Sequence, residues 1–305
     1  MNTRHAQLVL AVVREGSFTA AAKSLFVTQP TLSQQIRQIE QQLVQPIFER
    51  GTTPVSLTPA GQIYVQSARR FLQIEAQMNE SLAALSGRQT GLLRLGLPMQ
   101  RADELLPQVL PEFQSAYPDV RLQAVSARND ALEAGLLGGE LDMALLFGEA
   151  ENEKLDYQLI ASDEVILVAG RKTALAQRVP SGSTVSLSAC EGEKFVLPAE
   201  NLPFARAYDE LLARAALSPF VAIRTDDSQC AKRVCAACSL VMLCPFITLL
   251  SDTPAMQQLA HYRLSDAVYT PLYMAHPKDI PLTPYAQTLY TIMSNRFRAM
   301  TAYRL

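Results

Sequence analysis

The sequence lacks the short motifs that mark common enzyme classes. It contains no G-x-S-x-G, no H-E-x-x-H, no P-loop and no G-x-G-x-x-G. Histidine is scarce: His5, His261 and His276 stand singly, and none has a partner at the spacing of a metal site or a catalytic triad. These absences argue against an enzyme, and no cofactor or metal is expected.

The sequence also lacks an export signal and a run of apolar residues long enough to cross a membrane. Leu8–Val13 is too short for the apolar core of a signal peptide, and Arg14 follows it directly. The most apolar stretch, Val234–Leu250, has 17 residues and contains Pro245, whereas a spanning helix needs about 20. A cytoplasmic protein without a membrane partner is therefore expected.

Cysteine is sparse, and its five residues are an odd number, which suits a reducing compartment. Four of them cluster: Cys230, Cys235, Cys238 and Cys244. This Cys230–Cys244 cluster contains a C-x-x-C and has two interpretations. It is a thiol or metal switch whose thiolates the neighbouring Lys232 would favour, or it is a set of small apolar residues in a buried helix and strand.

Charge is distributed unevenly along the chain. Residues 1–90 carry eight Lys and Arg against five Asp and Glu, whereas the whole chain has a net charge of −2. A mildly basic head on an acidic body fits a small DNA-contacting unit.

The first fifty residues have the pattern of three short helices. A helix over Thr3–Glu15 ends at Gly16, and Ser17 is expected to cap a second helix that runs to about Leu25. Thr28 is the expected N-cap of a third helix with Pro30 in its first turn. The third helix has one apolar stripe, which consists of Leu32, Ile36, Ile39 and Leu43, and an outward face that is polar. Two extended pieces, Ile47–Arg50 and Val55–Leu57, then flank a turn and predict a wing.

A long helix is predicted from Thr58-Pro59 to about Ser86. Its apolar residues recur at a spacing near 3.5; they are Phe71, Ile74, Met78, Leu82 and Leu85. A thin helix cannot bury this stripe by itself, so it needs a partner. That partner is either a second copy of the chain, which we favour, or the C-terminal part of the same chain.

Strands and helices alternate after residue 90. The expected strands are Leu92–Leu97, Val120–Val125, Leu141–Phe147, Val165–Gly170, Val221–Thr225, Ser239–Cys244 and Val268–Ala275. Unbroken apolar strands alternating with helices predict parallel sheets that are covered on both faces.

The N-terminal segment resembles the signature of the LysR-type transcriptional regulators. The matching residues are Gly16-Ser17-Phe18-Thr19, Ala21-Ala22, Leu25, Gln29-Pro30, Ser33, Ile36, Glu40, Phe48, Arg50 and Leu57-Thr58-Pro59-Ala60-Gly61. The body resembles the family more loosely at Leu105-Leu106-Pro107, Phe113, Tyr117-Pro118-Asp119-Val120 and Gly139-Glu140-Leu141-Asp142. The sequence departs from the family at Val44, Cys238 and Leu240, where glycine is usual, and a different turn after the third helix and a different shape of part of the cleft are therefore expected.

The resemblance implies an α/β protein with an N-terminal all-α winged helix-turn-helix, a linker helix and a two-subdomain regulatory domain like a periplasmic binding protein. The implied divisions are 1–58 for DNA binding, 59–87 for dimerisation and 88–305 for the effector. Within the last, subdomain I is about 92–161 with 268–305, and subdomain II is about 162–267. The implied partners are double-stranded DNA, a small-molecule effector, a second copy through the linker helix, a tetramer of two such dimers, and RNA polymerase.

A recognition helix enters the major groove with its N-terminal residues at the base edges. The resemblance places this role on Gln29, Pro30, Thr31, Ser33, Gln34 and Arg37, and it makes Arg50 the phosphate contact of the wing. The competing interpretation is a solvated polar face on an ordinary helical bundle.

Ligands of such sheets bind outside the carboxyl ends of the strands. The expected effector residues are Pro98, Met99, Gln100, Arg101, Arg128, Phe147, Pro198, Thr225 and Ser228. Arg101 or Arg128 would hold an anion, although each arginine has acids near it with which it can pair instead. A rival of another class is a solute-binding or enzymatic two-domain α/β protein with an incidental helical head.

Overall fold

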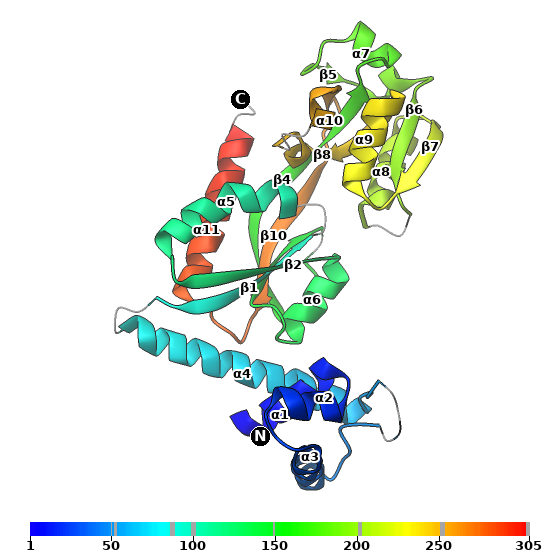
Figure 1. Ribbon diagram of the computed structural model, residues 1–305. Helices are drawn as coiled ribbons and strands as arrows, with labels where there is room; N and C mark the ends of the chain where they lie inside the picture. Colours follow the sequence, from blue (N-terminus) through cyan, green and yellow to red (C-terminus); the bar gives the residue numbers. More distant parts are fainter. Residues whose placement is uncertain are drawn as a thin grey trace.

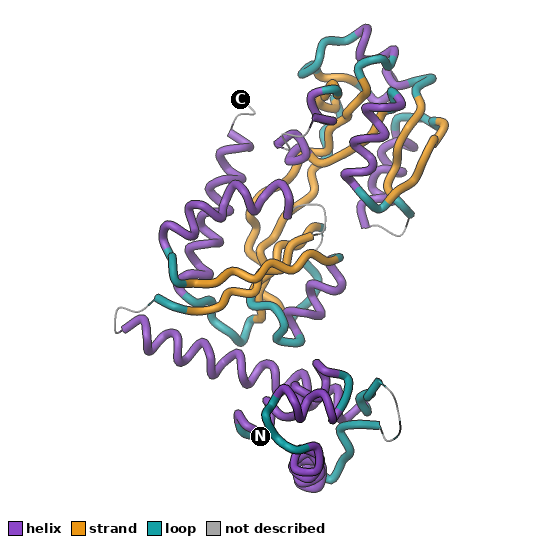
Figure 2. The backbone as a smooth tube through the Cα atoms, viewed as in Figure 1, coloured by secondary structure: helices purple, strands orange, loops and turns teal. Residues whose placement is uncertain are grey.

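The computed structural model describes residues 1–49, 51, 54–85, 89–98, 102–148, 150–200, 203–250 and 254–302. Over these ranges the chain forms a helical head, one long helix and two α/β subdomains (Figures 1 and 2). Among the helices described, none combines the length and the apolar composition that a membrane span requires. Four expected site residues, Arg50, Met99, Gln100 and Arg101, lie outside the described residues.

The head consists of α1 (Thr3–Glu15), α2 (Phe18–Ser24) and α3 (Gln29–Leu43), which share one apolar core. Gly16 ends α1 in the left-handed conformation with φ of 63°. In α3, the predicted stripe is buried except at its last residue, because Leu43 keeps 42% of its surface exposed. The three predicted helices are therefore confirmed, and the inner face of the third is wrong only at its end.

The turn after α3 keeps a left-handed C-cap although glycine is absent. Val44 has φ of 55° and ψ of 24°, and its N–H donates to the carbonyl oxygens of Gln41 and Glu40. The side chain carboxylate of Glu40 accepts from the N–H of Ile47 and of Phe48, at 2.8 and 3.3 Å. Position 44 thus adopts the left-handed conformation although its residue is β-branched, and this conformation costs roughly 1 kcal/mol.

The wing is short in the part of it that is described. One antiparallel bridge joins Phe48 to Leu57, and the N–H of Glu49 donates to the carbonyl of Ser56 at 2.9 Å. The two extended pieces predicted from sequence are therefore paired at this bridge, without forming longer strands there.

The long helix, α4, spans Pro59–Leu85. Thr58 precedes it and caps it, since its Oγ1 accepts from the N–H of Gly61 at 2.9 Å. Only glycine fits at position 61, because a Cβ atom there would lie 2.0 Å from the carbonyl oxygen of Ile47. This contact fixes the start of α4 against the head.

Subdomain I contains a five-stranded sheet with helices on both faces. Its strand order is β2 (Val120–Ala127), β1 (Gly91–Pro98), β3 (Met143–Phe147), β10 (Tyr269–Pro277) and the first half of β4 (Leu155–Gly170). The helices α5 (Ala102–Ala116) and α11 (Pro284–Ala302) share one core with it. The helix α6 (Asn129–Leu137) contributes to a smaller core on the other side.

Subdomain II surrounds the second half of β4. Its other strands are β5 (Thr184–Val185), β6 (Lys194–Pro198), β7 (Phe220–Thr225), β8 (Val241–Pro245) and β9 (Leu259–Leu264). One core contains α7 (Ala174–Arg178), η1 (Leu187–Cys190) and α8 (Pro203–Arg214). The other core contains α9 (Ser228–Cys238), α10 (Pro254–Gln257) and part of η2 (Phe246–Leu250).

The strand β4 belongs to both subdomains. It pairs with β10 as far as Glu164 and with β8 from Val165 onward. A second crossing is made by η2, because Ile247 is buried in the core of subdomain I although it follows β8. The N–H of Ile247 donates to the carboxylate of Asp163 at 3.4 Å.

The α/β fold class with a helical head is confirmed, and the expectation of purely parallel sheets is wrong. The strand β10 is antiparallel to both β3 and β4, and β4 is antiparallel to β8 and β9. The first half of β4 and the strands β5, β6 and β9 were not predicted from the sequence. Some of these alternate polar and apolar residues or are very short, so they lack the continuous apolar run that marks the other strands.

Candidate DNA-reading surface and effector pocket

The outward face of α3 presents the side chains expected to read DNA. Gln29, Pro30, Thr31, Gln34 and Arg37 are exposed, and Ser33 is half-buried. These six residues all come from the first nine positions of α3, the end at which a recognition helix contacts bases. The placement of this face in the structure therefore agrees with the one inferred from the pattern.

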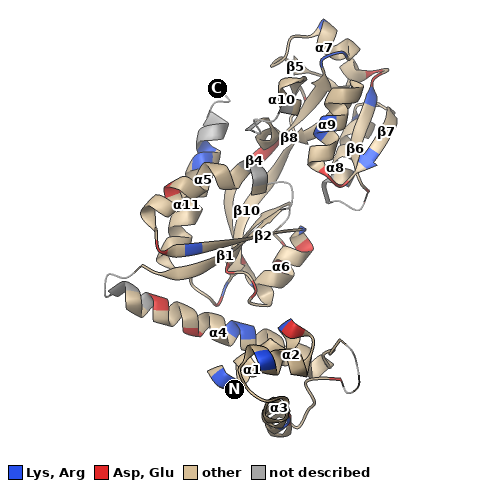
Figure 3. Ribbon diagram, in the orientation of Figure 1, with Lys and Arg blue, Asp and Glu red and all other residues tan. Residues whose placement is uncertain are grey.

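Two of these side chains bind each other. Gln29 donates from Nε2 to the hydroxyl of Ser33 at 2.9 Å, and Thr28 and Thr31 share a hydroxyl hydrogen bond of 2.8 Å. Such bonds within the helix hold polar side chains in a fixed order at the surface. In Figure 3 the ribbon of α3 is mostly tan, because Arg37 and Glu40 are its only charged residues. The face suits hydrogen bonding to base edges more than charge-driven contact.

The apolar stripe of α4 is exposed in this single chain. Phe71, Ile74, Met78 and Leu82 keep 38 to 56% of their surface accessible, and Ile63 keeps 68%. The regulatory part of the same chain therefore does not cover the stripe at these positions. Side chains of this size at a coiled-coil spacing are typical of a helix that pairs with another helix.

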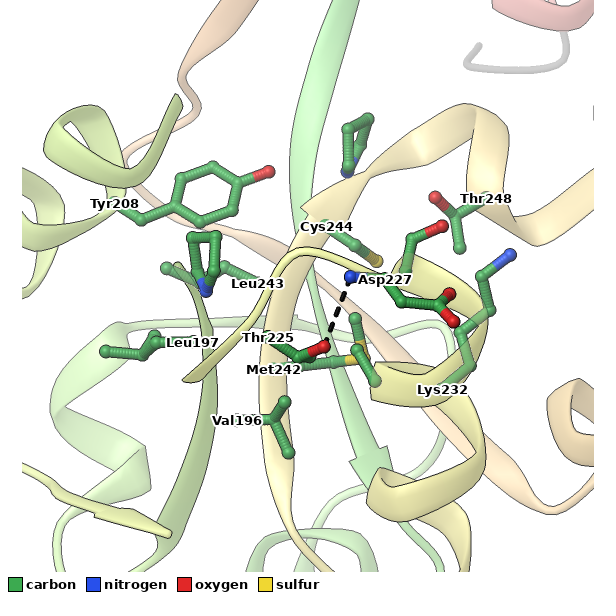
Figure 4. Close-up of a pocket in the computed structure, with 14 residues that line it drawn as sticks. Val196, Leu197, Tyr208, Thr225, Asp227, Lys232, Met242, Leu243, Cys244 and Thr248 are labelled. Carbon is green, nitrogen blue, oxygen red and sulfur yellow. Dashed lines mark hydrogen bonds between the residues drawn. The ribbon is translucent and has the colours of Figure 1, made fainter. Parts of the chain in front are cut away.

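A pocket of about 520 Å³, open to solvent, lies in subdomain II between α8, α9 and the ends of three strands (Figure 4). It contains three of the expected effector residues: Pro198 at the end of β6, Thr225 at the end of β7 and Ser228 in the first turn of α9. Most of the remaining lining is apolar, namely Val196, Leu197, Ala231, Met242, Leu243 and Pro245.

Several polar residues of this pocket were not expected as ligand contacts. They are Tyr208, Asp227, Lys232, Cys244 and Thr248. The least predictable is Lys232, whose side chain is almost completely buried with 1% exposure. Its position one turn after the start of a short amphipathic helix was a sequence signal for a ligand contact, but from the sequence Lys232 was connected only with the cysteines.

The negative charge of Asp227 is partly compensated by hydrogen bonds, so its repulsion of an anion is weaker than that of an isolated carboxylate. Its carboxylate caps α9 by accepting from the N–H groups of Gln229 and Cys230, at 2.8 and 3.1 Å. Its own N–H donates to the hydroxyl of Thr225 at 3.1 Å, which is the dashed line in Figure 4. The positive end of the α9 dipole is therefore already compensated, and an anion would need other donors in the pocket.

The remaining described effector residues form a second group in subdomain I. Pro98 is paired with Ala127 next to Arg128, and the carbonyl of Phe147 accepts from the side chain of Asn129 at 2.6 Å. Arg128 lies 3.4 Å from Asp130. These residues share one edge of the sheet, but none of them lines the pocket of subdomain II.

The cysteines occupy different environments. Cys235 and Cys244 are buried, Cys230 is half-buried and Cys238 is exposed, and all four are reduced. Burial, with Cys244 nearby, raises the pKa of Cys235 to about 12, so at neutral pH it is a thiol rather than the thiolate that binds metals or reacts. Within the described ranges, no three His, Cys, Asp or Glu residues are grouped as metal ligands.

Two family models match the chain. The model described as the bacterial regulatory helix-turn-helix protein, lysR family, matches residues 3–62, and the LysR substrate binding domain matches residues 86–298. Together they cover the head and nearly all of the two subdomains.

Relatives and solved structures agree with these models. A probable RuBisCO transcriptional regulator of Gracilaria tenuistipitata var. liui is 32% identical over 165 residues, so the match spans 53% of this chain and 53% of that relative. An uncharacterized HTH-type transcriptional regulator of Bacillus subtilis is 24% identical over 99% of this chain and 92% of its own. The LysR family regulator CbnR, in complex with its target DNA, superposes with a TM-score of 0.67 at 22% identity over 97% of this chain and 100% of its own.

Proposed function

Because the chain belongs to the LysR family of bacterial transcriptional regulators, we propose that it reads two DNA half-sites as a dimer and responds to a small anion held in the cleft of its regulatory domain. The family itself makes the protein a DNA-binding regulator with an effector-binding domain rather than an enzyme. The proposal adds which residues read DNA, how two copies pair and where the effector binds.

The observation that carries the proposal is the exposed polar face of α3. We propose that Gln29, Pro30, Thr31, Ser33, Gln34 and Arg37 contact bases and that Arg50 contacts phosphate. The proposed divisions are residues 1–58 for DNA binding, 59–87 for dimerisation and 88–305 for the effector, with subdomain II at about 162–267.

Dimerisation is supported by the exposed stripe of α4. Two copies that pair through Phe71, Ile74, Met78 and Leu82 would bury these side chains and place two heads on neighbouring half-sites. We further propose that two such dimers form a tetramer and that the assembled regulator contacts RNA polymerase.

The effector is proposed to be a small anionic metabolite with an apolar body. The pocket in subdomain II supports this, since it combines apolar walls with the hydroxyls of Thr225, Ser228 and Thr248 and the ammonium of Lys232. Pro198 from the same pocket, and Pro98, Met99, Gln100, Arg101, Arg128 and Phe147 from subdomain I, complete the proposed site.

The test is a thermal-shift screen of organic acids, each paired with its neutral amide. A molecule that binds only the folded chain raises the melting temperature by mass action. We expect acids to stabilise the whole chain and their amides to do so less, and an acid that stabilises should also change its affinity for DNA. Equal shifts with acids and amides would contradict an anionic effector.

A further inference from the structure

The linker helix has a second face that is polar, and this face lies against the regulatory domain of the same chain. Along α4, Gln66, Arg69, Gln73 and Glu80 recur every three, four and seven residues, which places them on one side of the helix. In Figure 1, α4 runs below the sheet of subdomain I, beside the end of α6. The contacts of these four residues define a joint.

The joint begins at the turn that follows α6. Gln66 donates to the carbonyl of Leu137 at 3.0 Å, and Arg69 is paired with Glu140 at 2.6 Å. Gly139 lies between these two contacts with φ of 72°, and a Cβ atom there would come within 3.1 Å of the backbone at Arg69. The helix and the turn therefore approach each other closely through their backbones, and a side chain at position 139 would fit only if one of them shifted.

The centre of the joint is Asp142. One carboxylate oxygen accepts from Nε2 of Gln73 at 2.8 Å, and the other accepts from the N–H of Arg94 at 2.7 Å. Gln73 is 4% exposed, and its Oε1 has no hydrogen-bond partner among the described residues. The amide orientation follows from this geometry, because a carbonyl oxygen turned towards the carboxylate would be repelled.

A last contact ties the C-terminal part of α4. The hydroxyl of Tyr285, at the start of α11, donates to the carboxylate of Glu80. Gly91 lies beside them, and a Cβ atom at that position would be 2.9 Å from the Tyr285 hydroxyl. Four side chains over about four helical turns thus hold α4 along its length.

The joint is polar and incompletely filled. A small cavity of about 70 Å³ lies between α4 and subdomain I, lined by Gln73, Gln77, Glu80, Arg94, Asp142 and Tyr285 among others. A helix held by a few hydrogen bonds over a cavity can change its position at lower cost than one packed into an apolar core.

We infer that the segment Leu137–Asp142, together with Arg94 and Tyr285, is a seat that fixes the rotation of α4 relative to its own regulatory domain, with Asp142 as the positioning residue. Because the polar face of α4 lies against the regulatory domain, the apolar stripe on the other side of the helix points away from it and is available to a second copy. The seat therefore couples the orientation of each DNA-binding head to the regulatory domain of the same chain. This inference rests on the proposed pairing through the stripe, but not on any effector.

The decisive experiment is a charge exchange at the centre of the seat in the whole chain. Gln73→Glu places a second carboxylate against Asp142 and should release the helix. When Asp142→Asn is added, the amide introduced at position 142 donates to the new carboxylate, while its carbonyl still accepts from the N–H of Arg94. The double variant should therefore restore the seat. Gln77→Leu, one turn further along, is the matched control, since Gln77 lines the same cavity.

Two measurements report the position of α4 rather than the stability of the overall fold. Trypsin cleavage after Arg69 and Arg70 should be at least tenfold faster in Gln73→Glu, and should return to the wild-type rate in the double variant. On DNA carrying two half-sites selected from a random pool, wild type should discriminate against a half-turn change of spacing, and Gln73→Glu should lose most of that discrimination.

Sedimentation separates this inference from the proposed pairing. All these variants should remain dimers, whereas a charged substitution in the stripe should not. The seat is contradicted if Gln73→Glu leaves both cleavage and spacing discrimination unchanged, or if adding Asp142→Asn fails to restore them. A double variant with the same melting temperature as wild type excludes simple misfolding as the cause.

Discussion

The DNA-reading surface and the effector pocket are built in opposite ways. The first consists of six residues within nine consecutive positions of one helix, mostly exposed and with a single charge, whereas the second collects residues from 196 to 248 on several elements and contains a buried lysine. A surface of the first kind can be recognised from local pattern alone. A site of the second kind depends on how strands pair, so only part of it can be identified before the fold is known.

The largest expected effect is on the affinity for DNA, because the proposed dimer presents the DNA-reading surface twice. Met78→Glu with Leu82→Glu would place charges in the paired stripe, and the variant should sediment as a monomer. Its affinity for two-half-site DNA should fall by about hundredfold or more, because the second head is no longer tethered. The thermal shift caused by an acid in the pocket should persist.

The control adds the same charges away from the stripe, as Gln62→Glu with Asn79→Glu, two exposed positions of α4. That variant should remain dimeric. If it dissociates as well, charge rather than burial of the stripe explains the result.

A smaller effect is expected from the reading side chains themselves. Ser33→Ala and Gln34→Ala should each cost about 1–3 kcal/mol in binding to the specific site and leave nonspecific binding nearly unchanged. Fluorescence anisotropy with specific and scrambled duplexes measures both. Gln42→Ala, exposed in the last turn of α3, should bind both duplexes as wild type does. An equal loss on both duplexes would show that these residues do not read sequence.

The pocket is tested by comparing two cations. Lys232→Met should weaken binding of a stabilising acid by about 2 kcal/mol, roughly thirtyfold, since a buried cation near a ligand anion is lost. Arg128→Ala should cost less, because Arg128 is largely exposed and is paired with Asp130. Calorimetry with the strongest acid of the screen gives both values. The reverse order would move the anion site to subdomain I.

A modest gain in stability is expected at the turn after α3. Val44→Gly should raise the free energy of unfolding by about 1 kcal/mol, because glycine adopts the left-handed conformation without strain and the exposed Val44 loses little packing. Urea denaturation measures this. Gln45→Gly, where φ is not positive, should lower stability instead. A loss in both variants would mean that Val44 is not strained.

The smallest effect concerns the cysteines. With its pKa at about 12, Cys235 should be about one part in ten thousand thiolate at pH 8, and its alkylation should rise tenfold for each further pH unit. Exposed Cys238 should be labelled first, which mass spectrometry of iodoacetamide-treated protein would show. Rapid labelling of Cys235 at pH 8 would support the thiol-switch alternative for the Cys230–Cys244 cluster.

The comparison also explains how much the sequence could predict. The caps at Ser17 and Thr28 and the stripe of α3 are local signals, and they could be identified because helices depend on residues three or four apart. The strand β4 was only half recognised, because its first half carries Asp156, Gln158 and other polar residues. Pairing between distant strands has no such local signal.

The effector pocket, too, could be predicted only where a local signal marks its residues. Thr225 and Ser228 were predicted because they follow a strand, and the structure places both in the pocket. Lys232, Thr248 and Tyr208 enter it from a helix interior, a 3₁₀ turn and another helix, so only the fold brings them together. Asp142 was noted as part of a family resemblance, and its contact with α4 depends on residues 69 positions apart.

The path of η2 has a mechanical consequence. Ile247 is held in the core of subdomain I, and Thr248, the next residue, lines the pocket of subdomain II. One peptide bond therefore links the wall of the pocket to the hydrophobic centre of the neighbouring subdomain. The same segment is also bonded to β4, because the N–H of Ile247 donates to the carboxylate of Asp163 at 3.4 Å. The wall of the pocket is thus connected to the strand that both sheets share.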